Sequence, residues 1–482
     1  MNPASITRLD LLLAAPEIFM LAATCVVLLV DLFLTDRTRW VTFALAMLTL
    51  LGATLVTAQI GFVERTVGWH GTYVSDPLST LLKVVAFGAV AVAFLYGRGY
   101  LQARKLLRGE YYVLGLFALL GIMVLISANS LVTLYLGVEL LALSLYALVA
   151  FNRESGIAAE SAIKYFVLGS IASGALLYGM SIVYGVTGSL ELGVISGAAM
   201  QMEAGQIGLL FGLAFIVVGV AFKFGAVPFH MWVPDVYHGA PTPVTLFLAA
   251  APKLASFALA FRLLAEGLGP VHATGWQDMI TLVAVLSIAL GNVVAIAQSN
   301  IKRMLAYSTI SHVGFILLGI LAGTSEGYEA ALYYTITYVI MSVGGFGMVI
   351  LLSRKGFEAD SLEDFKGLNA RSPWFAAVML MLMFSMAGVP PFVGFWAKLA
   401  VIQAVLNIGS LWLAIVAVAF SVVGAYYYLR VVKLMYFDEP SDRAALEGTG
   451  AMRFVLSMNG LAVLLLGLFP GSLLAVCAAV IP

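Results

Sequence analysis

The chain has 482 residues, of which 62% are hydrophobic and only 10% are charged, against roughly 25% charged residues in soluble domains. This composition excludes a soluble globular protein and indicates one that crosses a membrane many times. Lysine plus arginine and aspartate plus glutamate balance at 25 each, so no net charge attracts nucleic acid, and two cysteines are too few for a disulfide framework or a thiolate metal site.

The sequence lacks the common cofactor motifs. It contains no CxxC pair, no P-loop, and no GxGxxG segment that opens a helix after a strand. We therefore expect no redox centre, nucleotide or metal site in this chain. At its start, Glu17 interrupts the first apolar run and Asp31 ends it, which favours a retained first helix over a cleaved signal peptide.

Apolar runs of membrane-spanning length recur along the whole chain. A spanning helix needs about 20 mostly apolar residues. Runs of this kind begin near residues 11, 41, 77, 111, 131, 161, 206, 244, 278, 303, 327, 373, 410 and 453. The sequence therefore predicts an all-α polytopic membrane protein with about 14 transmembrane helices. The polar stretches between them are too short to fold as separate soluble domains.

Basic residues gather in every second loop, and this bias sets the orientation of a membrane protein. With a periplasmic N-terminus, 17 basic residues fall in cytoplasmic loops, and only Arg8, Arg65 and Arg262 fall on the opposite side. The 17 are Arg37, Arg39, Arg98, Arg104, Lys105, Arg108, Arg153, Lys302, Arg303, Arg354, Lys355, Lys366, Arg371, Arg430, Lys433, Arg443 and Arg453. Both termini are therefore predicted to be periplasmic, in a bacterial inner membrane.

Five further lysines fall inside predicted spans: Lys83, Lys164, Lys223, Lys253 and Lys398. An ionisable group there costs roughly 2.5–3.5 kcal/mol and usually marks an ion or proton route. Lys83 lies two turns into its segment, where it can reach the interface, so Lys83→Ala is expected to have little effect. Lys164 lies one turn inside its segment, and snorkelling explains it as well as a functional role does.

The stretch 223–253 concentrates ionisable residues and prolines between apolar runs. It reads KFGAVPFHMWVPDVYHGAPTPVTLFLAAAPK and holds Lys223, His230 and Lys253. Proline breaks the helical hydrogen-bond ladder, and a broken helix at membrane depth is tolerated only where it is packed in protein or lines a watered cavity. A Pro-kinked helix with snorkelling lysines is the alternative, but the pattern favours a proton or ion route.

A second disturbed helix follows at MLMFSMAGVPPFVGFWAK, where Gly388, Pro390 and Pro391 precede Lys398. Two interrupted segments at matching places in two halves are typical of inverted repeats. We therefore expect helices 4–8 and 9–13 to form two inverted five-helix repeats, with helices 7 and 12 broken. The resulting division is 1–110 for the first three helices, 111–266 and 276–436 for the repeats, and 453–482 for the last helix.

Three further features admit more than one interpretation. Glu139 lies among apolar residues, several positions from either end of its segment, so it should be protonated or paired. His312 and His230 are either buried neutral histidines or proton-relay groups. The run Tyr426–Tyr428 near a helix end indicates an interfacial belt.

These residues resemble the antiporter-like, proton-translocating membrane subunits of respiratory complex I. The match runs through VELLALSLYALVAF, ESAIKYFVLGSIASG, FKFGAVPFHMWVPDVYHGAPTPV, KRMLAYSTISHVGF and SMAGVPPFVGFWAK, from residue 138 to residue 398. Within the family, the chain is most similar to a branch that has 14 helices and no long C-terminal lateral helix. Position 398 is a lysine, whereas another branch typically has glutamate there.

The resemblance implies a proton route through named residues. Glu139 matches a glutamate that tunes the neighbouring lysine Lys223, Lys253 matches the central lysine, and Lys398 matches the lysine on the exit side. Lys164 matches a lysine seen in only part of the family, and His230 and His312 are candidate relay groups.

The resemblance also implies partners and cofactors. Electron transfer from NADH through FMN and iron–sulfur clusters to quinone would take place in other subunits, so the expected partners are the other membrane subunits of complex I, its peripheral redox arm and the lipid bilayer. Two alternatives remain: a subunit of a multi-subunit Na⁺/H⁺ antiporter, or a non-pumping scaffold. The four buried groups Glu139, Lys223, Lys253 and Lys398 argue against a scaffold.

Overall fold

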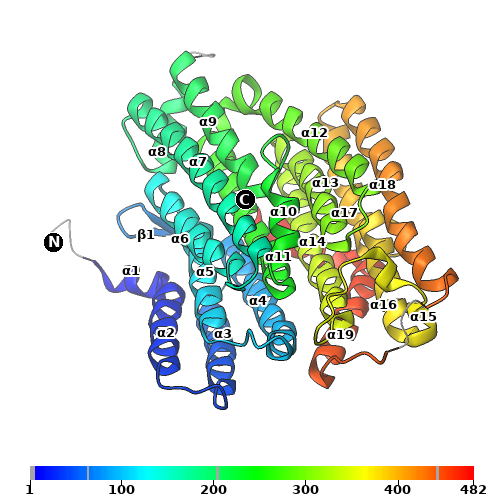
Figure 1. Ribbon diagram of the computed structural model, residues 1–482. Helices are drawn as coiled ribbons and strands as arrows, with labels where there is room; N and C mark the ends of the chain where they lie inside the picture. Colours follow the sequence, from blue (N-terminus) through cyan, green and yellow to red (C-terminus); the bar gives the residue numbers. More distant parts are fainter. Residues whose placement is uncertain (1–5, 62–63, 202–205, 441–443) are drawn as a thin grey trace.

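The computed structural model describes residues 6–61, 64–201, 206–440 and 444–482, and helices dominate it (Figure 1). Among these residues, 11 helices are long and apolar enough to cross a membrane, and four shorter apolar helices accompany them. The helices begin within a few residues of the predicted starts. They are α1 Arg8–Leu13, α2 Ala15–Asp31, α3 Trp40–Ile60, α4 Pro77–Ala103, α5 Glu110–Ile126, α6 Leu131–Val149, α7 Gly156–Thr187, α8 Leu192–Met200, α9 Ile207–Phe224, α10 Trp232–Gly239, α11 Thr242–Ala260, α12 Gln277–Ile296, α13 Ile301–Leu321, α14 Ser325–Leu352, α15 Leu368–Arg371, α16 Pro373–Ala387, α17 Val393–Asn407, α18 Leu411–Phe437, α19 Gly450–Leu468 and α20 Pro470–Val480.

The helices form a central group and a rim. The most apolar stretch of the span containing α11 is 100% buried, and those of α13 and α14 are 94% buried, whereas those of α3 and α18 are 33% buried. Figure 1 accordingly places α11 and α14 in the middle and α3 and α18 toward opposite sides. A helix that is apolar all round is stable only inside a larger protein or in lipid. The central group is therefore the place where buried polar side chains need protein partners.

Two small elements were not expected from the sequence. Strands β1 Thr66–Gly68 and β2 Tyr73–Ser75 pair antiparallel, with Gly68 opposite Tyr73. The short helix α8 lies between α7 and α9, in one of the stretches that separate the apolar runs. Three-residue strands are too short to show an alternating pattern, and for this reason the periodicity of the sequence could not reveal the hairpin.

Lys83 is buried, so its predicted interfacial position was wrong. Its side chain is 3% exposed, its Nζ lies 2.6 Å from Oε1 of Glu17 on α2, and it donates a 3.1 Å hydrogen bond to the Tyr73 hydroxyl. The Tyr73 hydroxyl in turn donates to the second Glu17 oxygen at 2.9 Å. The cation has a carboxylate partner inside the protein and has no need to reach the interface.

Replacing Lys83 with alanine should therefore destabilise the protein. The change leaves the buried Glu17 carboxylate without its cation, and breaking a buried ion pair from one side costs roughly 3–5 kcal/mol. Thermal unfolding of the purified chain in detergent should show a clearly lower midpoint for Lys83→Ala. The double variant Glu17→Gln/Lys83→Met removes both charges and should recover most of the loss. Equal midpoints for Lys83→Ala and the parent would contradict this account.

Arg262 is likewise inside the protein, not in an outer loop as predicted. It lies in a π-helical continuation of α11, Phe261–Gly267, and its side chain is 1% exposed. Its guanidinium contacts Asp76 at 2.7 Å and Glu266 at 2.8 Å. Burial alone would raise the pKa of Asp76, but the Arg262 guanidinium and the Ser79 amide lower it below its usual value. Asp76 therefore caps α4 and anchors α11 at the same time.

Candidate functional site

The first helix break lies between α9 and α10 and provides a backbone hydrogen-bond acceptor for a buried lysine. Helix α9 carries Lys223 in its last turn and ends at Gly225, which adopts the left-handed conformation at φ +75°. The chain then runs without regular helix until α10. Because the helix stops, the carbonyl of Phe224 has no continuing helical donor, and Nζ of Lys253 on α11 donates to it at 2.6 Å.

The second break, between α16 and α17, has the same arrangement. Helix α16 ends at Gly388, again left-handed at φ +87°. The carbonyl of Ala387 accepts a 2.8 Å hydrogen bond from Nζ of Lys398 on α17. The same ammonium donates to the Ser421 hydroxyl of α18 at 2.8 Å. Each break therefore converts a terminal helix carbonyl into the partner of a buried lysine.

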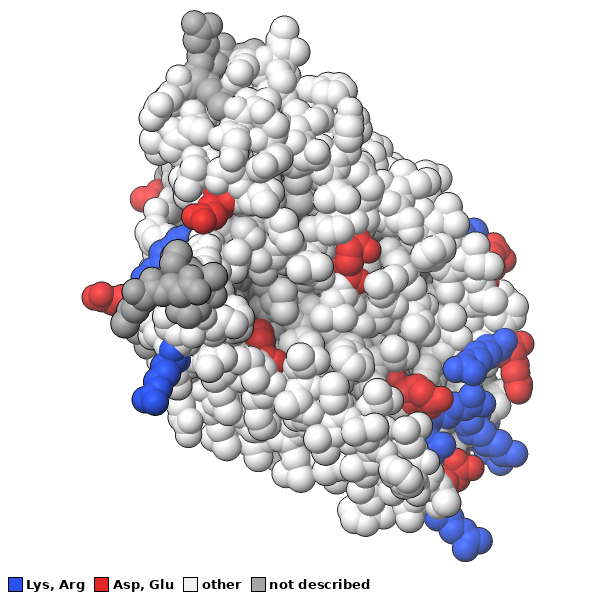
Figure 2. All heavy atoms as spheres, turned by 90° about the vertical axis from the view of Figure 1, so that its left-hand side faces the viewer, with Lys and Arg blue, Asp and Glu red and all other residues white. Residues whose placement is uncertain are grey.

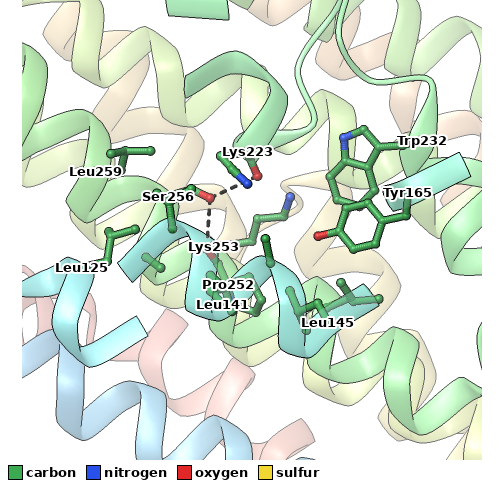
Figure 3. Close-up of a pocket in the computed structure, with 14 residues that line it drawn as sticks. Leu125, Leu141, Leu145, Tyr165, Lys223, Trp232, Pro252, Lys253, Ser256 and Leu259 are labelled. Carbon is green, nitrogen blue, oxygen red and sulfur yellow. Dashed lines mark hydrogen bonds between the residues drawn. The ribbon is translucent and has the colours of Figure 1, made fainter. Parts of the chain in front are cut away.

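Lys223 and Lys253 line one cavity, shown in Figure 3. Its volume is 30 Å³, enough for about two water molecules. Trp232 and Tyr165, which are stacked with ring centroids 4.6 Å apart, form one wall. Ser256 on α11 donates to the carbonyl of Lys223 at 3.2 Å. The helix break thus brings two amines, a hydroxyl and water-sized space together in an apolar surrounding.

Glu139 is close enough to Lys223 for an electrostatic interaction but not for an ion pair within 4 Å in the described structure. Its carboxylate is half-buried on an outer face of α6, between the exposed side chains Leu136 and Leu143. One of its oxygens is buried and has no hydrogen-bond partner among the described residues. The structure thus allows this carboxylate to interact with Lys223 electrostatically at a distance, without a direct contact.

His312 bridges two tyrosines in the core between α13, α14 and α18. Its Nδ1 lies 2.8 Å from the Tyr334 hydroxyl and its Nε2 lies 3.0 Å from the Tyr428 hydroxyl. Tyr428 continues to Ser308 at 2.5 Å. An imidazole with a hydroxyl on each nitrogen can accept a proton on one side and release it on the other.

The tyrosine run lies in the middle of α18, not near a helix end as predicted. Tyr426 is exposed, but Tyr427 and Tyr428 are buried. The Tyr427 hydroxyl donates to Asn292 at 3.1 Å. Consecutive residues of a helix point about 100° apart, so one run contributes both to the surface and to the core. The belt interpretation of Tyr427 and Tyr428 was therefore wrong.

Lys164 and His230 are not brought into contact with the other candidate residues. The Lys164 side chain is 44% exposed and pairs with Glu160 at 2.8 Å and Asp235 at 2.9 Å. Asp235 also pairs with Arg303 at 2.8 Å. His230 lies in the irregular segment between α9 and α10, and its Nδ1 is buried without a hydrogen-bond partner in the described structure.

Sequence reasoning missed one buried lysine, Lys302, which it placed in a loop. The residue lies in the first turn of α13, is buried, and donates to the carbonyl of Ala240 at 3.0 Å. A signal was present, because Asn300 caps α13 by accepting from the amide of Arg303, and asparagine is a preferred N-cap. Within the described ranges, no three His, Cys, Asp or Glu side chains are placed to hold a metal ion.

Comparisons with known proteins show which family the sequence matches. The family model described as "NADH:quinone oxidoreductase/Mrp antiporter, TM" matches residues 128–424, more than half of the chain. NADH-quinone oxidoreductase subunit N of Thioalkalivibrio sulfidiphilus is 60% identical over 473 residues, covering 98% of each chain.

Two solved structures have similar folds. A chain of respiratory complex I from Thermus thermophilus with bound aureothin is 30% identical, with a TM-score of 0.83 and coverage of 96% of this chain and 99% of that one. A chain of the Mrp complex from Dietzia sp. DQ12-45-1b is 22% identical, with a TM-score of 0.84 and coverage of 98% and 97%. At that identity the Mrp chain is evidence of a shared fold alone.

Proposed function

The chain belongs to the family of NADH-quinone oxidoreductase subunit N, the antiporter-like, proton-translocating membrane subunit of bacterial complex I, and on that premise we propose that Lys223, Lys253 and Lys398 carry its proton. The redox centres of the complex reside in other subunits. One observation carries the proposal: Lys253 and Lys398 each donate to a carbonyl that a helix break has freed. The antiporter alternative is not favoured, because a relative with 60% identity is a subunit of NADH-quinone oxidoreductase.

The freed carbonyls make two charge states accessible to Lys253 and Lys398. Burial removes the hydration of an ammonium group, and a hydrogen bond to a carbonyl restores part of the lost stabilisation. The charged and neutral amines are then closer in free energy than they would be in a purely apolar core. A small change in the local field is enough to move the proton, and we propose that Glu139 supplies this change at Lys223.

The two halves of the route need a group that passes the proton between them. Lys223 and Lys253 share the cavity of the first half, whereas Lys398 belongs to the second break. We propose that His312 passes the proton toward Lys398, because its two ring nitrogens contact hydroxyls of different helices. Lys164 and His230 are not assigned a step, since neither contacts these groups.

Replacing His312 with phenylalanine tests this assignment. The change keeps an aromatic ring but removes both nitrogens, so NADH-driven pumping and quinone reduction in vesicles should fall together. A tenfold loss corresponds to about 1.4 kcal/mol in the barrier, and we expect at least this much. Tyr428→Phe removes only one hydroxyl partner and should have a smaller effect. Full pumping by an assembled His312→Phe complex would rule His312 out as a relay.

The two breaks also support a repeated architecture. We propose that residues 111–266 and 276–436 form two inverted five-helix repeats after the N-terminal helices of 1–110, with 453–482 as the last helix. Each repeat contains one interrupted helix that ends at a left-handed glycine and frees a carbonyl for a lysine. Counting the helix pairs α9–α10, α16–α17 and α19–α20 as interrupted single spans gives about 14 spanning helices.

We further propose that both termini are periplasmic. Lys302 and Arg262 are buried in the protein, so removing the first from 17 leaves 16 cytoplasmic basic residues, and removing the second from three leaves two. One of the 16, Arg443, lies outside the described residues. The bias of basic residues still favours this orientation.

Reporter fusions test the orientation. A reporter fused at Glu447 should be located in the cytoplasm and one fused at Met200 in the periplasm, and the reverse location at both sites would refute it.

A further inference from the structure

A basic cavity lies at the ends of four successive helices, on a part of the chain separate from the buried lysines. Its volume is 820 Å³, and it is bounded by the connection between α4 and α5 and the connection between α6 and α7. Its lining includes the cations Arg104, Lys105, Arg108 and Arg153, against the single carboxylate of Glu154. Positive charge therefore exceeds negative charge inside this concave surface.

Most of these cations have no carboxylate to neutralise them. Arg104 contacts Glu358 at 2.7 Å. Lys105, Arg108 and Arg153 are exposed, and none of them has an ion-pair partner within 4 Å in the described part of the chain. Clusters of basic side chains beside membrane helices attract anionic lipid headgroups, each contributing about 1 kcal/mol near the surface. The three unpaired cations are thus available to an anion.

One helix end adds to the same field. Helix α7 begins at Gly156, directly after the lining residue Ser155. The N-terminus of a helix carries a partial positive charge. Helix α5 begins nearby at Glu110, but this carboxylate and that of Asp31, which lies against Gly109, offset the positive charge of its N-terminus.

The cations of this cavity lie close to the ends of membrane-spanning helices. Lys105 is two residues beyond the end of α4, and Arg153 is three residues before the start of α7, so the cations follow directly on membrane-spanning helices. Next to them, apolar side chains at the start of α7 are exposed, among them Ile157 and Ile163. Figure 2 shows a largely uncharged face whose Lys and Arg side chains gather mainly near its lower right edge.

We propose that this cavity binds the phosphate headgroup of an anionic phospholipid, whose acyl chains lie along the exposed face of α7. Charge complementarity selects an anion, and the adjoining apolar helix face selects one that carries hydrocarbon chains. A free phosphate ion would use the cations but not this face. The site adds a lipid-binding role to the subunit and does not depend on the route that the proton takes.

The test uses the intact complex, stripped of loosely held lipid in mild detergent and exposed to phosphatidylglycerol or to phosphatidylcholine. Retained lipid per complex is counted by mass spectrometry for the parent and for Arg108→Gln/Arg153→Gln. A matched control, Lys366→Gln/Lys433→Gln, removes two cations that are already paired with Glu363 and Asp438. The conservative variant Arg108→Lys/Arg153→Lys keeps the charge.

We expect the glutamine variant to retain about one phosphatidylglycerol fewer per complex, with no change in phosphatidylcholine. The lysine variant and the matched control should retain as much as the parent. Equal phosphatidylglycerol retention in all variants would overturn the proposal. Displacement of the lipid by millimolar inorganic phosphate would show a soluble-anion site instead. Loss of a neighbouring subunit along with the lipid would show that an acidic protein segment occupies the cavity.

Discussion

Replacing Lys253 with methionine is expected to abolish NADH-driven proton pumping. Methionine keeps the length and apolar volume of the side chain but has no amine to carry a proton. The carbonyl of Phe224 also loses its 2.6 Å donor, and an unsatisfied buried acceptor costs about 1–3 kcal/mol. Because proton transfer and electron transfer are coupled, quinone reduction should fall with pumping. The measurement is proton uptake and NADH oxidation in inverted vesicles, after assembly has been confirmed.

The variant Lys253→Arg separates proton transfer from a purely structural role of the charge. Arginine keeps a cation that can donate to Phe224, but in proteins it does not give up its proton. If Lys253 must release a proton, Lys253→Arg should fail almost as completely as Lys253→Met. If only a fixed charge is needed, the arginine variant should retain most activity, and the route proposed here would be wrong. Lys164→Met removes an exposed lysine that is paired with Asp235 and serves as the matched control.

The second large effect is expected at Glu139. Glu139→Gln removes the charge that we propose to act on Lys223, so pumping and quinone reduction should fall together by about tenfold or more, equivalent to about 1.4 kcal/mol. Glu139→Asp keeps the carboxylate and should retain much more activity. The assay is the same vesicle measurement, with assembly checked for each variant.

Position 143 offers a sharper test of the same charge. It lies one turn along α6 on the same outer face, where residues four apart are neighbours, and the exposed Leu143 leaves room for a carboxylate. Glu139→Gln combined with Leu143→Glu should therefore recover part of the activity. Leu143→Glu alone is the control for the added charge. Full pumping by assembled Glu139→Gln would refute the role of the carboxylate.

Much of the fold was predictable because its causes are local. Apolar runs of spanning length placed the helices to within a few residues. Helix α4 begins at Pro77 directly after its cap Asp76, and both are start signals in the sequence. The two breaks were also predictable, since Gly225 and Gly388 are followed closely by prolines. A glycine adopts a positive φ without steric cost, so each break is a property of a few adjacent residues.

The partners of the buried ionisable residues were decided by the tertiary structure. Lys83 looks interfacial in sequence because its partner Glu17 lies on another helix, and Arg262 looks like a loop residue because Asp76 is 186 positions away. Whether a charge can remain in the membrane depends on the groups that surround it there. For the same reason Tyr428 could be recognised as a partner of His312 only once α13 and α18 were packed together. Helix positions follow from neighbours along the chain, whereas the partners of a buried charge follow from neighbours in space.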